Sequence, residues 1–130
     1  MGLDNYAARH PEGGLTEEDE QAFRDAGIDL CGGMHSDGVV SFRGKWYDPL
    51  VSHVTGVSLY QEWIPPEIVR QMAEALNRYS SEQLAEIWDH IAPLPPMDGE
   101  KVFHSEREVA DLQRFFAICA ERGLGLKGWW

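Results

Sequence analysis

Cysteine is scarce in this chain, and long apolar runs are missing. The two cysteines, Cys31 and Cys119, stand far apart in the sequence. The first residues show no basic segment followed by an apolar one, as a secretion signal would, so we expect a cytoplasmic protein with reduced thiols. No stretch reaches the roughly 18 apolar residues that a membrane-spanning helix needs, so we expect no membrane segment.

Positive charge is also in short supply. The chain has 22 Asp and Glu residues against 11 Lys and Arg, which gives a formal net charge of −11. At physiological salt such a charge repels DNA, RNA and anionic lipid over a Debye length of about 8 Å. We therefore expect no direct nucleic-acid binding and no membrane contact, and a protein partner that is neutral or basic.

The negative charge is unevenly distributed along the chain. Residues 1–30 hold eight acids and two bases, and residues 61–130 hold twelve acids and seven bases. Residues 31–60 hold two of each, together with several glycines, two histidines and four aromatic residues. A neutral, glycine-rich and aromatic segment between acidic ones is where we expect a functional site.

The length and the apolar fraction of 43% predict one globular domain. We expect a loose N-terminal tail over residues 1–14 and a single globular domain over residues 15–130. Helical spacing of apolar residues, N-cap residues and stop signals predict five helices. Their approximate ranges are 16–27, 48–56, 65–79, 80–92 and 105–123.

The start signals differ from helix to helix. Thr16 is a predicted N-cap, and Asp48 followed by Pro49 is a typical helix start. Ser80 with Gln83, and Ser105 with Glu108, have the spacing of capping boxes, and the second pair is the clearer one.

Two β-prone runs lie close together in the neutral segment. Residues 39–42 and 45–47 are separated by Arg43 and Gly44, which favours a small β-hairpin over residues 39–47. The expected class is therefore α+β, mainly α, with about five helices packed around a core and one small hairpin.

A cysteine and two histidines in the neutral segment suggest a possible catalytic site. A cysteine nucleophile needs a base within hydrogen-bond reach and a carboxylate that orients the base. Cys31, His35 or His53, and Asp37 or Asp48 supply those types, and the glycines beside Cys31 are able to leave amides free for an oxyanion. No diagnostic spacing is present, so an apolar cysteine beside an ordinary glycine turn explains the same residues.

The same residues raise the question of a metal. Cys31, His35 and His53 would make three zinc ligands, but their spacing fits no standard knuckle. The Asp37-Gly38 pair resembles the middle of a calcium loop, but glycines stand where the first and last carboxylate ligands belong. We therefore expect neither a metal nor a cofactor.

Aromatic residues are numerous, and several have no periodic reason to be buried. Trp88 lies on the apolar face of its predicted helix, whereas the terminal tryptophans either fold back onto the core or form an exposed end. Trp and Tyr are enriched at interfaces. The predicted binding residues are Trp46, Tyr47, Tyr60, Glu62, Trp63, Trp129 and Trp130.

Two functions remain open from the sequence. The first is a small acidic protein–protein interaction module, such as an inhibitor, an immunity-like protein or an accessory protein, that docks a neutral or basic partner through aromatic anchors. Only its composition, and no motif, is shared with such proteins. The alternative is a small enzyme or ligand-binding domain with a Cys/His site in residues 31–63.

Overall fold

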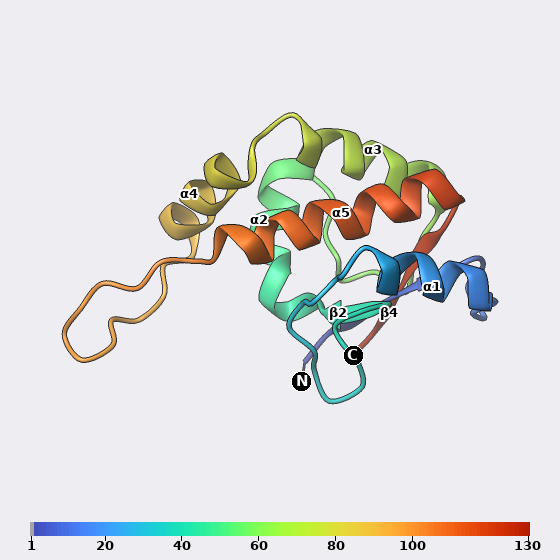
Figure 1. Cartoon of the computed structure of the whole chain (residues 1–130), viewed down its shortest axis with the longest axis horizontal. Helices are drawn as coiled ribbons and strands as arrows, with labels where there is room; N and C mark the ends of the chain where they lie inside the picture. Colours follow the sequence, from blue (N-terminus) through green and yellow to red (C-terminus); the bar gives the residue numbers. More distant parts are fainter. Residues whose placement is uncertain (1) are drawn as a thin grey trace.

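Helices dominate the computed structural model, which describes residues 2–130 (Figure 1). The chain is 47% helical, which confirms the expected α+β, mainly α class. No helix in the described part is long and apolar enough to cross a membrane. Within residues 2–130 there are five helices and four short strands, in the order β1 (Asp4–Ala8), α1 (Glu17–Asp25), β2 (Ser41–Arg43), α2 (Gly44–Thr55), β3 (Trp63–Ile64), α3 (Pro66–Asn77), α4 (Ser81–Ile91), α5 (Glu106–Arg122) and β4 (Gly125–Trp129).

The strands form one antiparallel sheet in the order β2-β1-β4-β3. Paired residues on neighbouring strands share a face, so the register divides the sheet into two faces. On the inner face, Ala7 lies opposite Leu126, which lies opposite Ile64, and all three are buried. On the outer face, Asp4 lies between Arg43 and Trp129.

The helices pack on the inner face through one hydrophobic cluster. The ring of Phe115 on α5 lies 4.8 Å from that of Phe23 on α1 and 5.0 Å from that of Phe42 on β2. Helix α5 also contacts α3 and α4. The long last helix therefore holds the first helix, the sheet and the middle helices together.

Three predicted N-caps are present, but one capping box is incomplete. Thr16 and Ser80 each accept from the backbone three residues on, and Asp19 and Gln83 complete the boxes. Ser105 accepts from the amide of Glu108 at 3.2 Å. The Glu108 side chain does not return to the cap, because it accepts from Tyr47 at 2.7 Å instead.

The predicted loose tail is wrong for residues 4–8. They form β1, an inner strand of the sheet, paired with β2 on one side and β4 on the other. Leu3 and Ala7 are buried in the core, and so is Asn5. A strand this short carries only a few apolar residues, so its hydrophobic pattern is too weak to stand out in the sequence.

The predicted hairpin over residues 39–47 is also wrong. Residues 41–43 pair with β1, and α2 begins directly afterwards at Gly44 rather than at Asp48. Tyr47, Leu50 and Val51 are spaced for one face of a helix and are fully buried. Burying each contributes about 1.5–3 kcal/mol, which outweighs the roughly 3 kcal/mol cost of Pro49 inside the helix.

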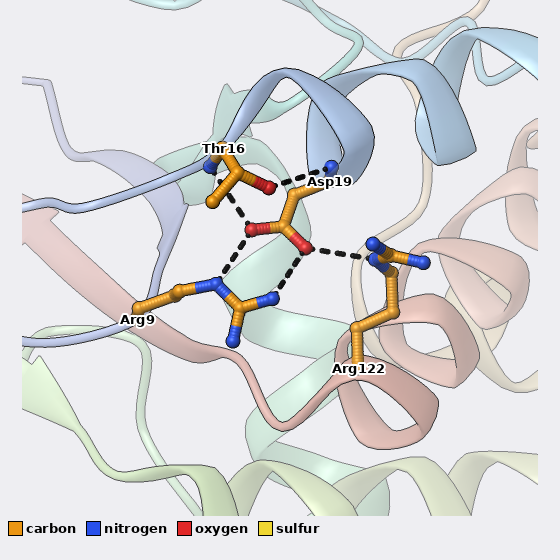
Figure 2. A network of polar contacts seen from close by, with 4 residues as sticks. All are labelled: Arg9, Thr16, Asp19 and Arg122. Atoms are coloured by element: carbon orange, nitrogen blue, oxygen red, sulfur yellow. Dashed lines mark hydrogen bonds and ion pairs between the residues drawn. The ribbon is translucent and has the colours of Figure 1, made fainter.

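An ion-pair network fixes both ends of the chain to α1 (Figure 2). The Asp19 carboxylate accepts from Arg9 at 2.7 and 2.8 Å, from Arg122 at 2.8 Å and from the Thr16 amide at 3.0 Å. The Asp19 side chain has no exposed area. Arg9 follows β1 and Arg122 ends α5, so the contact joins segments from opposite ends of the sequence.

The environment of Asp19 keeps it ionised. Burial on its own would raise the pKa of this carboxyl, but the hydrogen bonds from Arg9, Thr16 and Arg122 outweigh it. They hold the pKa well below its usual range. The native state therefore gains stability from the ionised carboxylate.

Asp19→Asn is expected to lower the free energy of unfolding by about 2–3 kcal/mol, because charge-assisted hydrogen bonds are lost inside the protein. Urea unfolding at pH 7 measures the change. Glu18→Gln alters an exposed acid one residue away and serves as the control, with an expected change within about 0.5 kcal/mol.

The same comparison has a defined pH dependence. A lowered native pKa adds stability above the unfolded pKa of about 4 and loses it as the pH falls below that value. The difference between wild type and Asp19→Asn should therefore be about 1 kcal/mol smaller at pH 3 than at pH 7. A difference that is small at pH 7, or the same at both pH values, would contradict the network's role.

Candidate functional site

The outer face of the sheet carries large side chains that the core does not use. Trp129 lies on this face opposite Asp4, and Lys127 lies between Tyr6 and Trp63. None of Tyr6, Trp63 and Trp129 belongs to the hydrophobic cluster or to the residues packed against it. The sheet therefore has one face buried under helices and one that presents aromatic rings.

Four aromatic residues gather at one corner of this sheet, which we call the aromatic corner: Tyr60, Trp63, Trp129 and Trp130. The Tyr60 and Trp130 rings meet edge to face with their centroids 6.0 Å apart. Trp129 is 57% exposed and Trp130 is 48% exposed. The last strand is thus docked in the sheet, while its terminal indoles remain open to solvent.

The ring of Trp63 lies against the backbone of β4. A β-carbon at Gly125 would lie 2.6 Å from this ring and 2.5 Å from the carbonyl oxygen of Ile64. Only glycine therefore leaves room for the indole to lie across the neighbouring strand.

The two terminal indoles stand between two hollows. A groove of about 450 Å³ lies on one side and is lined by Pro11, Glu62, Trp63, Lys127, Gly128, Trp129 and Trp130. A wider hollow of about 820 Å³ lies on the other and is lined by the same two indoles together with Met34, His35, Arg43, Asp4 and neighbouring backbone. Aromatic surface beside recesses that carry both signs of charge is suited to holding side chains of a partner.

The aromatic corner is held in place through Leu59. The Asp48 carboxylate accepts from the Leu59 amide at 2.7 Å, and Asn5 Nδ2 donates to the Leu59 carbonyl at 3.1 Å. The Glu62 carbonyl accepts from the Gly128 amide at 3.1 Å. Asp48, predicted as a helix cap, thus anchors the segment that presents Tyr60.

Two predicted binding residues belong to the interior instead. Tyr47 is fully buried, and its hydroxyl accepts from the Cys31 amide and donates to Glu108, both at 2.7 Å. Burial raises the pKa of this hydroxyl, and Glu108 adds to the shift, so it remains a donor. Trp46 is half-buried and donates to Glu108 at 3.3 Å. Tyr47 is therefore not a surface anchor, and Trp46 offers only part of its ring.

The two histidines of the predicted Cys/His constellation lie in different hollows. Cys31 lies half-buried in a loop, with its sulfur 3.7 Å from the Gly32 carbonyl. His35 lines the wider hollow beside the terminal indoles, whereas His53 lies on α2 in a groove shared with Glu86 and His90 of α4. No hydrogen bond joins Cys31 to either histidine in the described part of the chain.

Asp37, the predicted orienting carboxylate, shapes its own loop. It accepts from the amides of Val39 and Val40 at 2.8 and 3.1 Å and from the Ser41 hydroxyl at 3.1 Å. Such contacts are those of an Asx turn. Over residues 2–130, no group of three or more His, Cys, Asp or Glu side chains is placed to hold a metal ion.

The sequence reasoning missed Met34, Arg43 and Lys127 as neighbours of the exposed indoles. Lys127 and Trp129 alternate with the buried Leu126 and Gly128, which is the period of a half-buried strand. That alternation was the available signal, and the surrounding glycines obscured it. Met34 and Arg43 come from a loop and an edge strand that only the tertiary fold brings near the C-terminus.

Comparisons with known proteins give no further guidance: no family model, no curated protein and no solved structure matches this chain. The functional argument therefore depends on the geometry of the chain itself.

One thiol should be accessible in the native protein. Cys119 is fully buried, and burial raises the pKa of its thiol, whereas Cys31 is partly exposed. We expect a thiol reagent at pH 7 to modify Cys31 no faster than a thiol in an unfolded peptide, and Cys119 only after denaturation. Cys31→Ala should show no labelling until the protein is denatured. If Cys31 is labelled much faster than a peptide thiol, the result would instead support the hypothesis that Cys31 is a nucleophile.

Proposed function

We propose that this chain is a cytoplasmic protein–protein interaction module that docks its partner on the aromatic corner. The observation that carries the proposal is the exposure of two adjacent indoles at the end of β4: Trp129 on the outer face of the sheet, and Trp130 one residue beyond the strand. Trp and Tyr dominate the binding energy of protein interfaces, because each buries about 150–250 Å² while keeping a polar group.

The terminal indoles are not among the buried residues of β4, which are Gly125, Leu126 and Gly128. The strand is held in the sheet by its pairing with β1 and β3. An exposed apolar surface rimmed by polar residues is typical of an interaction site rather than of a folding requirement. The arrangement is also largely preformed, since the segment with Tyr60 is anchored through Leu59, so little ordering cost is left for binding.

The partner that fits this surface presents a basic side chain next to an apolar one. Glu62 lines the same groove as Trp63 and the terminal indoles, and a carboxylate beside indole faces attracts Lys or Arg. The chain's net charge of −11 also steers a basic partner toward it. Lys127 in the same groove disfavours a second cation deeper on the sheet face.

The alternative function, an enzyme or ligand-binding domain with a Cys/His site, has less support. Cys31, His35 and His53 share no hydrogen bond and no cavity, and Asp37 is engaged in its own loop. No contact among these side chains favours covalent chemistry over an ordinary structural role.

The proposal predicts partner capture that depends on the aromatic corner. Immobilised wild-type protein and Trp129→Ala/Trp130→Ala are compared in the same native lysate, and retained proteins are identified by mass spectrometry. We expect at least one basic protein to be retained by wild type and lost from the double variant, because truncating an aromatic anchor costs about 2 kcal/mol or more. Retention should weaken as salt rises.

Tyr79→Ala is the matched control, since Tyr79 is 40% exposed, as Tyr60 is, but lies in the connection between α3 and α4. It should retain the same protein as wild type. Glu62→Gln should weaken retention of a basic partner and reduce its salt dependence. If every protein retained by wild type is retained equally by Trp129→Ala/Trp130→Ala, the aromatic corner is not a docking surface.

A further inference from the structure

The connection between α4 and α5 projects far from the body of the molecule (Figure 1). We call residues 93–103 the proline arm. It begins Pro93-Leu94-Pro95-Pro96, and all three of these prolines are exposed. Met97 and Phe103 are 67% and 63% exposed, although both are apolar.

The prolines of the arm restrict its backbone dihedral angles. Each proline ring fixes φ near −65°, and a residue that precedes proline is pushed toward extended ψ. Leu94 and Pro95 both precede a proline, so this sequence favours polyproline II geometry over residues 93–96. Among the backbone hydrogen bonds of the described residues, none involves residues 93–96, as this helix type requires.

The tip of the arm is closed by a tight turn. Met97 and Glu100 exchange two backbone hydrogen bonds of 3.0 and 2.9 Å. Between them, Asp98 has φ of 52° and Gly99 has φ of 77°. Two successive positive φ values are those of a type I′ turn, for which Asp-Gly is a preferred pair.

The base of the arm is clamped by His104. Its amide donates to the Asp89 carboxylate at 2.7 Å, and its Nε2 donates to the Ala92 carbonyl at 2.8 Å, because a carbonyl only accepts. Its buried ring stacks on Trp88 with 3.8 Å between centroids and 8° between planes. The two ends of the arm are thus joined to each other and to the core.

An exposed segment held at both ends, with three prolines in four residues, is preorganised for recognition. We propose that the proline arm is a second contact site, bound by a protein domain whose aromatic-lined groove recognises polyproline II. Such grooves exploit the low conformational entropy of this helix, and the clamped base and closed tip reduce the ordering cost further.

The charged residues of the arm indicate which charge the partner's binding groove must carry. Asp98 and Glu100 stand exposed at the tip, directly after the prolines. Lys101 points its ammonium at the ring of Phe103, 5.7 Å from the centroid. The groove that fits this arm is therefore aromatic in its floor and basic at the rim that meets the tip.

The test uses the full chain and a panel of purified SH3, WW and EVH1 domains as probes, with binding measured by calorimetry. At least one domain, with a basic rim, is expected to bind wild type, and Pro93→Ala/Pro96→Ala is expected to weaken that binding at least about tenfold. Pro49→Ala replaces an exposed proline outside the arm and should bind like wild type.

Thermal unfolding of each variant controls for stability, which the arm substitutions should leave unchanged since these prolines make no hydrogen bond to the body. Trp129→Ala/Trp130→Ala should also bind the panel like wild type, so failure of the aromatic corner and failure of the arm are distinguishable. The proposal is overturned if no domain binds, or if Pro93→Ala/Pro96→Ala binds as tightly as wild type.

Discussion

The Asp19 carboxylate binds Arg9 and Arg122, and this contact determines where both ends of the chain lie. Arg9 directly follows β1, and Arg122 is the last residue of α5, three residues before β4 begins with Gly125. By holding both arginines at the start of α1, the carboxylate brings β1 and β4 side by side. Their antiparallel register then places Trp129 opposite Asp4 on the outer face. The ion pair thus lies beside one end of the β1–β4 pair, and Trp129 lies at the other end.

The two proposed contact surfaces lie on different elements. The aromatic corner belongs to the sheet end where the chain terminates, and the proline arm extends from the junction of α4 and α5 (Figure 1). Each is fixed by buried polar contacts: Asn5 and Asp48 hold Leu59 beneath the corner, and His104 closes the base of the arm. If both proposed sites bind one partner, the second contact forms intramolecularly and strengthens the binding without any change in either site.

The helices were predictable from the sequence because their signals are local. Thr16 and Ser80 cap helices as their spacing predicts, and Gly123 ends the last one. The sheet was not predictable in the same way, because its strands have two to five residues and pair across most of the chain. The aromatic rings of the corner were named from the sequence, but the fold decided that Tyr47 is buried and that His35 and His53 line different hollows. Which residues are buried and which lie near one another depends on long-range contacts, and these cannot be deduced from composition.

The central claim is that the terminal indoles are exposed in the free protein and are covered when a partner binds. Hydroxyl-radical footprinting, read residue by residue in the purified protein and again in native lysate, measures both. Trp129, Trp130 and Tyr60 should oxidise readily in the purified protein and become protected in the lysate, while Tyr79 stays reactive and Trp88, which is 1% exposed, stays protected in both. Terminal indoles that are already protected in the purified protein, or equally reactive in both conditions, would contradict the account.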